Sequence, residues 1–219
     1  MCKPITPEML DSLRACVREK MSPYRYAHTL GVEEAVCTLA ALYLPEKITE
    51  LRAAALLHDL TKEWAHERTL TFLRENGVLL RADEQASPRI LHGITAPLVI
   101  KAEFPAFATP TVLSAVRWHT TGHAEMTLPE ALLYLADYIE PGRRFEDCVA
   151  LRAAFFEPKP ENMERAARLG HLWQVLLCSF DDTLAALAAE GAPTCADTVA
   201  ARAAVLAKTN CPRKEENDE

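Results

Sequence analysis

The sequence lacks most features of extended or tightly turning folds. Only 7 of its 219 residues are glycine, whereas alanine and leucine abound, which favours helices. We find no convincing run of alternating polar and apolar residues, the pattern that predicts β-strands. The absence of strand signals predicts an all-α fold.

The sequence also lacks signs of export, disulfide bonding or membrane insertion. Its seven scattered cysteines form no C-x-x-C pair, which argues against a disulfide framework or a structural zinc site. The start, MCKPITPEML, has no apolar signal-peptide core. No segment approaches the roughly 20 apolar residues that span a bilayer. We therefore expect a cytoplasmic protein without membrane contact.

The sequence also has no excess of positively charged residues. The formal net charge is −7, and this argues against a broad nucleic-acid interface, which needs excess basic surface. A small phosphorylated ligand held by a few local cations stays compatible with that charge. The 49% hydrophobic content is enough for one globular domain with a core that can hold a closed site.

Helix starts are marked by capping residues followed by proline. Several ends are marked by glycine. The predicted helices run from Thr6-Pro7 to about 20, from Ser22-Pro23 to about 44, from Thr49 to about 58, over 65–76, from Ser87-Pro88 through His92, from Thr109-Pro110 to Gly122, from Thr127 to Pro141, and over 146–156, 162–190 and 193–206. We predict an N-terminal helix in 1–20, a main domain over 21–191, and an alanine-rich extension with a disordered charged tail over 192–219.

The stretch AAALLHDLTK places His58 and Asp59 side by side at the end of an apolar segment. One interpretation is a helix C-terminus, where a histidine meets the helix dipole and an aspartate starts a turn. A second apolar segment, LLYLADYIE, contains Asp137. Burying an unpaired carboxylate costs several kcal/mol, so Asp137 needs a metal, dense hydrogen bonding, or a salt bridge to an arginine such as Arg143.

Three more histidines, His28, His92 and His119, also lie beside apolar helical segments. Nitrogen and oxygen ligands without cysteine suit iron, manganese or magnesium better than structural zinc. Adjacent helical side chains diverge by about 100°, so His58 and Asp59 can hold one metal from two sides, or the carboxylate can bridge two. Metal-bound water is a nucleophile near neutral pH, and the metal neutralises an attacked phosphate.

The order H…HD…H…H…D on helices resembles the HD phosphohydrolase superfamily. More narrowly, RYAHTLGVEEA, AALLHDLTK, ILHGITAP, AVRWHTTGHAEMT and LLYLADYIEPGR resemble the bacterial YqeK family of HD-domain symmetrical diadenosine tetraphosphate hydrolases, over roughly residues 20–190. The resemblance implies a single helical HD-domain fold with a metal site between helices. It also implies iron as cofactor, in one or two ions, with manganese or magnesium as alternatives.

The resemblance further implies cleavage of a dinucleoside polyphosphate, diadenosine tetraphosphate, at its centre into two ADP, by a protein that is a monomer or a homodimer. The competing interpretations are an HD-type nucleotide phosphatase and a non-catalytic metal module that binds a nucleotide. All three share the metal site and differ in the outer pocket or in turnover.

Particular residues acquire roles from this resemblance. The primary metal ligands would be His28, His58, Asp59 and Asp137. His92 and His119 would complete a second metal site or face the substrate phosphates. The cations for the polyphosphate would be Arg25, Lys62 and Arg143, with Arg89 a weaker candidate, and ordinary solvated charge is the competing interpretation for each. Asp59 and Lys62 are the candidates for catalytic residues. Gly31 and Gly122 would allow close approach of the ligand, and Thr120 would donate a hydroxyl hydrogen bond.

Overall fold

The computed structural model describes residues 4–210, which form helices and contain no strand. The α-helices are α1 (Pro7–Arg18), α2 (Pro23–Tyr43), α3 (Ile48–Leu57), α4 (His66–Glu75), α5 (Ala82–Ala86), α6 (His92–Glu103), α7 (Pro110–Trp118), α8 (Leu128–Ile139), α9 (Glu146–Phe156), α10 (Arg165–Glu190) and α11 (Ala196–Asn210). Single 3₁₀ turns occupy Pro45–Lys47, Pro88–Ile90, Pro105–Phe107 and Pro160–Asn162. The all-α prediction is confirmed. The predicted disordered tail, TNCPRKEENDE, starts too early, because α11 includes Thr209 and Asn210, and its remainder from residue 211 lies outside the described residues.

Several helix starts follow the predicted capping chemistry. The side-chain oxygens of Thr6, Ser22 and Thr109 each accept a hydrogen bond from the backbone N–H three residues on, which satisfies a donor that the helix itself leaves free. Other predicted boundaries are wrong. Thr49 is not a cap, because α3 begins at Ile48 after Lys47, which makes no side-chain cap hydrogen bond. Pro88–Ile90 is only a 3₁₀ turn, so α6 begins at His92, and α7 ends at Trp118 rather than at Gly122.

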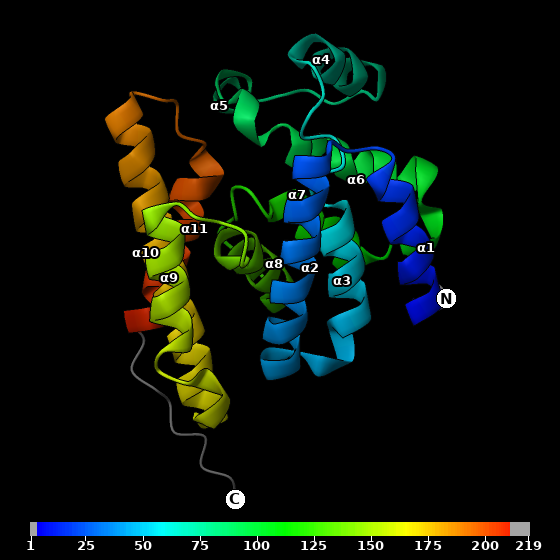
Figure 1. The fold of residues 1–219 in the computed structure, drawn as a ribbon. Helices are drawn as coiled ribbons and strands as arrows, with labels where there is room; N and C mark the ends of the chain where they lie inside the picture. The colour runs from blue at the N-terminus through cyan, green and yellow to red at the C-terminus, as the bar shows by residue number, and fades with distance from the viewer. Residues whose placement is uncertain (1–3, 211–219) are drawn as a thin grey trace, which may run out of the picture.

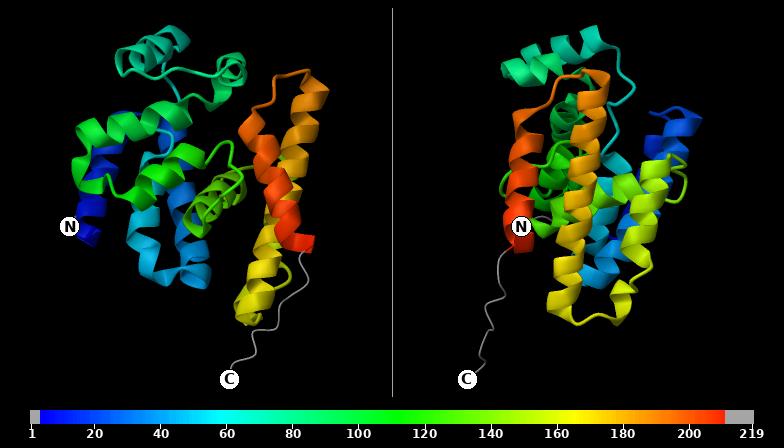
Figure 2. Two further views of the ribbon diagram at one scale, coloured as in Figure 1. Left: turned by 180° about the vertical axis from the view of Figure 1, so that it is seen from behind. Right: turned by 90° about the vertical axis from the view of Figure 1, so that its left-hand side faces the viewer.

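The helices pack in three groups around one core (Figure 1). The α2–α3 pair packs against α1, α7 and α8, α6 packs on α7 near α1, and α9 to α11 cover the other side of α8. Figure 2 shows α4 and α5 together at one end of the molecule. The buried core cluster runs from Ile5 to Val205, so α1 and α11 both contribute to it. The domain boundaries proposed at residues 20 and 191 stay predictions.

Helix α10 contradicts one expectation from the sequence. Among the described helices it alone is long and apolar enough to cross a membrane, although by length and composition only. Polar residues such as Gln174, Asp181 and Asp182 interrupt its apolar residues, so the helix has no apolar run along its whole length. Leu172, Val175, Leu176 and Phe180 of this helix are buried in the core cluster, and core helices of soluble proteins share this composition.

Candidate metal centre

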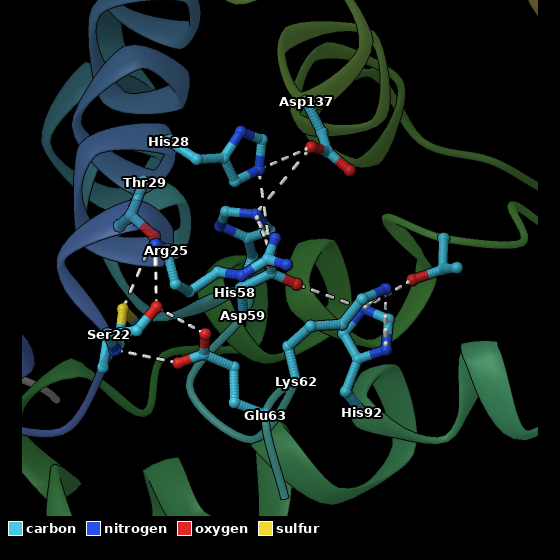
Figure 3. Close-up of polar contacts among 12 residues, drawn as sticks. Ser22, Arg25, His28, Thr29, His58, Asp59, Lys62, Glu63, His92 and Asp137 are labelled. Carbon is cyan, nitrogen blue, oxygen red and sulfur yellow. Dashed lines mark hydrogen bonds and ion pairs between the residues drawn. The ribbon is translucent and has the colours of Figure 1, made fainter. Parts of the chain in front are cut away.

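The six predicted ligand side chains meet where five helices begin or end. They are His28 in the second turn of α2, His58 and Asp59 directly after α3, His92 at the start of α6, His119 directly after α7, and Asp137 in the last turn of α8. Figure 3 shows five of them, His28, His58, Asp59, His92 and Asp137. His58, Asp59, His92 and His119 are buried. The fold therefore brings together side chains that are separated by more than a hundred positions along the chain.

Asp59 lies between two pairs of histidines. Its Oδ2 atom is 3.7 Å from Nε2 of His28 and 3.4 Å from Nε2 of His58. Its Oδ1 atom is 3.2 Å from Nε2 of His92 and 3.8 Å from Nε2 of His119. The two oxygens of one carboxylate thus face two different groups of imidazole nitrogens, the arrangement expected of a carboxylate that bridges two ions.

Asp137 fits two of the interpretations that the sequence left open, a metal ligand and the partner of an arginine. Its Oδ1 atom is 3.0 Å from Nε2 of His28 and 4.0 Å from Nε2 of His58. The same oxygen pairs with Arg143 at 2.6 Å. Asp137 is less enclosed than its apolar neighbours in the sequence suggest, because 19% of its side-chain surface stays exposed. It is therefore both an ion-pair partner and a candidate metal ligand.

The orientation of the histidine rings leaves their Nε2 atoms free for a metal. The Nδ1 atoms of His58 and His119 lie 2.6 and 2.7 Å from the backbone carbonyl oxygens of Ala55 and Val116. A carbonyl only accepts hydrogen bonds, so each Nδ1 carries the proton and each Nε2 presents a lone pair. The buried Nε2 atoms of His28 and His58 have no hydrogen-bond partner, an unfavourable arrangement that a bound cation would relieve. The residues present fit a metal ion.

Two overlapping groups satisfy the spacing that a metal ion requires. Within the described residues, the ligand atoms of His28, His58 and Asp137 lie within 4.8 Å of one another, and so do those of His58, Asp59 and His119. Both groups offer only nitrogen and oxygen donors, the set suited to iron, manganese or magnesium. The two groups have His58 in common.

Glu140, which the sequence analysis did not select, holds His28 in place. Its buried carboxylate lies with Oε1 3.1 Å from Nδ1 of His28, and Oε2 accepts a hydrogen bond from the backbone N–H of Gly142 at 2.5 Å. Gly31 lies against this carboxylate, where an added Cβ would overlap Oε2 of Glu140. The space beside Gly31 is thus filled by protein rather than open to a ligand. The signal was available, since Glu140 follows Asp137 by three positions, one helical turn.

Three of the four predicted cations lie at the centre. Arg25 pairs with Oδ2 of Asp59 at 2.5 Å, Arg143 pairs with Asp137, and Nζ of Lys62 lies 3.3 Å from Nε2 of His92. Figure 3 shows Arg25 and Lys62 extending toward Asp59 and His92. An ionised carboxylate has about four acceptor positions, so pairing with an arginine leaves positions for a metal.

The electrostatics keep the two aspartates ionised. Burial opposes ionisation of Asp59, but the neighbouring His58 and further hydrogen bonds hold the pKa of that carboxyl well below its usual range. Burial likewise opposes ionisation of Asp137, whereas the Arg143 guanidinium and His28 hold its pKa well below the usual range. Both groups are therefore anions at neutral pH, the form that binds a metal.

His92, His119 and Thr120 form the other end of the centre. The Nε2 atoms of the two histidines are 3.0 Å apart, and Oγ1 of Thr120 lies 3.2 and 3.1 Å from them. Burial, together with the charge of Lys62, lowers the pKa of His92 to about 3. The ring is therefore neutral at physiological pH. Neutral imidazole and a hydroxyl suit a second metal or a substrate phosphate.

Two residues that were predicted to lie next to the ligand, Arg89 and Gly122, make other contacts instead. Arg89 is exposed and pairs with Glu190 at 2.7 Å. Gly122 adopts a left-handed backbone conformation with φ of 60°, and an added Cβ there would come within 2.8 Å of Phe180 and 2.9 Å of Ala201. Gly122 therefore serves the packing of α10 and α11 against the turn after α7.

The chain is similar to known proteins over much of its length. The HD domain family model matches residues 25–142, more than half of the chain. A symmetrical bis(5'-nucleosyl)-tetraphosphatase from Halalkalibacterium halodurans is 35% identical over 133 residues, which cover 59% of this chain and 67% of the relative. Proteins of the same name from Staphylococcus aureus and Bacillus subtilis are 32% identical over 138 residues and 27% identical over 184 residues, covering 61% and 84% of this chain and 68% and 90% of the relatives.

A solved structure shares the fold over nearly its whole length. The crystal structure of a predicted HD superfamily hydrolase involved in NAD metabolism, from Clostridium acetobutylicum, superposes with a TM-score of 0.77 at 29% identity. The match covers 90% of this chain and 97% of that one. The structural match therefore extends well beyond the segment that contains the histidines and aspartates of the candidate metal centre.

Proposed function

The chain belongs to the HD domain family, and from that premise we propose that it is a metal-dependent hydrolase that cleaves diadenosine tetraphosphate symmetrically into two ADP. The observation that carries the proposal is the pair of unpartnered Nε2 atoms of His28 and His58, which lie opposite the carboxylates of Asp59 and Asp137. The names of the relatives, which are 27–35% identical, support the choice of substrate.

The proposed ligand set divides around Asp59. His28, His58, Asp59 and Asp137 would hold one ion, and Asp59, His92 and His119 would hold a second. Iron is the proposed metal, with manganese or magnesium as alternatives. When bound, such an ion lowers the pKa of a water molecule and offsets negative charge on phosphate oxygens.

The side chains around these ligands would orient the metal site and bind the polyphosphate. Glu140 and two backbone carbonyls fix the histidine rings. Arg25, Lys62 and Arg143 place positive charge beside the carboxylates. In the reaction, the water oxygen bonds to one of the two central phosphorus atoms, the bond from that phosphorus to the bridging oxygen breaks, and the water releases its protons to the solvent. The bridging oxygen leaves with the second ADP, where the cations stabilise its charge. We assign Asp59 and Lys62 as the catalytic residues.

The setting of this activity follows from charge and composition. The net charge of −7 supports a small-molecule substrate rather than a nucleic acid. We propose that the enzyme works in the cytoplasm without membrane contact, as a monomer or a homodimer, with residues 21–191 as its catalytic domain.

A substrate panel tests this proposal. The protein is loaded anaerobically with ferrous iron and offered diadenosine tetraphosphate, ATP, p-nitrophenyl phosphate and NAD, with His58→Ala and Asp59→Ala alongside. We expect fastest turnover of diadenosine tetraphosphate, and loss of that turnover in both variants. Preference for the phosphomonoester would favour a phosphatase, and nucleotide binding without turnover would favour a non-catalytic module.

A further inference from the structure

A cavity of about 470 Å³ opens beside His28. It lies between the N-terminal turn of α2 and the segment that joins α8 to α9. Its lining comprises Tyr24, Arg25, Ala27 and His28 from α2, and Glu140, Gly142, Arg143, Arg144 and Phe145 from the connecting segment. Because His28 and Arg143 also contact Asp137, the cavity adjoins the candidate metal centre.

Two aromatic side chains in this lining are unusually exposed. Tyr24 is 74% exposed and Phe145 is 64% exposed. Most other large apolar residues of the described chain are packed in the core or partly buried against it. Exposed aromatic rings at the mouth of a cavity indicate a surface that a ligand covers, since covering them removes apolar area from water.

The charge around these rings specifies what kind of ligand fits. Arg25, Arg143 and Arg144 line the same cavity, and two of them reach the carboxylates of the metal centre. Guanidinium groups bind phosphate oxygens with paired donors. Flat rings beside guanidinium groups that lead to a metal centre suit a ligand with a planar base joined to phosphates.

We propose that this cavity binds the nucleoside end of one ADP half of the substrate, with Tyr24 and Phe145 as the stacking surface for the base. The identity of the substrate rests on the proposed function, whereas the assignment of the two rings rests on the cavity itself. Base stacking uses the face of an aromatic ring, so the ring of Tyr24, rather than its oxygen, would make the contact.

Calorimetric titration with ADP and with inorganic pyrophosphate tests the proposal, because pyrophosphate has the same diphosphate group but no base. The variants are Tyr24→Ala and Phe145→Ala, with Tyr24→Phe to keep the ring. Leu79→Ala is the matched control, since Leu79 is 94% exposed and lies outside this cavity. All proteins are titrated both iron-loaded and with chelator, and their melting temperatures are recorded to confirm the fold.

We expect the Kd for ADP to rise about tenfold or more in Tyr24→Ala and Phe145→Ala, with the Kd for pyrophosphate unchanged. In turnover of diadenosine tetraphosphate, KM should rise in the same two variants while kcat changes little. Tyr24→Phe and Leu79→Ala should match the unaltered protein. Equal weakening of ADP and pyrophosphate, or no weakening of either, would overturn the proposal. Failure of the unaltered protein to cleave the tetraphosphate would instead contradict the proposed function. The ADP titrations would still test whether the two rings bind the base.

Discussion

Asp59 is the side chain on which the account of the metal centre depends most. Each of its two carboxylate oxygens faces a different pair of histidines. The Oδ2 atom also accepts a hydrogen bond from Arg25. No other carboxylate among the described residues touches both sides of the centre in this way. Its removal should therefore affect both groups of ligands at once.

We predict that Asp59→Ala loses bound metal and at least about 100-fold in turnover, since even residues that only support metal ligands contribute 10- to 100-fold. Metal content by elemental analysis and turnover of the tetraphosphate check this. The control is Asp181→Ala, which removes an exposed carboxylate paired with Arg202. Unchanged metal content in Asp59→Ala would contradict the ligand assignment.

Gly31 provides a second prediction, because it makes room for Glu140 rather than for a ligand. A methyl group at Gly31 would overlap Oε2 of Glu140 and so disturb the partner of His28. We predict that Gly31→Ala and Glu140→Ala each weaken metal affinity by about 10- to 100-fold. Metal titration measures this. Gly170→Ala, on α10 with open space around it, should leave metal affinity unchanged. If Gly31→Ala binds metal normally, Glu140 is not the support we describe.

At the residue scale, the sequence was enough to select the candidate ligands, whereas it did not reveal the residues that support them. His28, His58, Asp59 and Asp137 stand in a recurrent order of histidine and aspartate, which a sequence displays directly. The role of Glu140 depends on a carboxylate folding back over Gly31, a three-dimensional contact. Arg89 carries the same charge as Arg143 in the sequence, but only the fold decides that Arg89 reaches Glu190 instead of the centre.

At the scale of elements, the start of α8 is held by a network around Glu130. This buried carboxylate accepts hydrogen bonds from the hydroxyl of Ser114 on α7 and, at 2.6 Å, from the backbone N–H of Thr127, and it lies 3.0 Å from Nε2 of His123. Burial opposes its ionisation, but these hydrogen bonds lower the pKa of Glu130. The network positions α8, and with it Asp137.

The lowered pKa of Glu130 predicts how stability depends on pH. A carboxyl whose folded pKa lies below its unfolded value, about 4.3 for glutamate, stabilises the fold fully above that value and loses this contribution as the pH falls through the folded pKa. Glu130→Gln should therefore cost about 1–3 kcal/mol at pH 7 and progressively less below pH 4. Urea unfolding of both proteins with chelator, from pH 7 to 3, measures the difference. A difference independent of pH would contradict this.

The turn after α7 gives another prediction at this scale. Gly122 has a φ of 60° and lies against Phe180 and Ala201, so Gly122→Ala adds both backbone strain and a clash. Gly191 has a similar φ of 62° but open space around it. We predict that Gly191→Ala costs about 1 kcal/mol of unfolding free energy and that Gly122→Ala costs clearly more. Equal costs by chemical denaturation would show that packing around Gly122 is unimportant.

Helix positions were largely predictable because capping chemistry is local. Thr6, Ser22 and Thr109 bond to backbone groups only three residues away, so their sequence patterns suffice. Ser87-Pro88 has the same pattern but begins a single 3₁₀ turn, because tertiary packing decides whether the turn continues. His92 therefore starts α6 instead of lying within a helix.

At the scale of the whole molecule, the candidate metal centre draws its side chains from α2, α6 and α8 and from the residues directly after α3 and α7. A ligand that binds only the folded state stabilises it, by about 2.7 kcal/mol at 100 times its Kd. We predict that iron raises the melting temperature, that chelator reverses the rise, and that neither affects His58→Ala. If iron leaves the melting temperature of the unaltered protein unchanged, the result would contradict a metal site formed by these helices.

The most direct test of the central claim is product analysis in water labelled with ¹⁸O. The iron-loaded protein is incubated with diadenosine tetraphosphate, and the first products are separated and their masses are measured by mass spectrometry. The account predicts ADP as the sole early product, with one labelled oxygen for every two ADP, because water attacks one central phosphorus and the other half leaves unlabelled. ATP together with AMP would contradict it, since the cut would then fall outside the centre of the bridge.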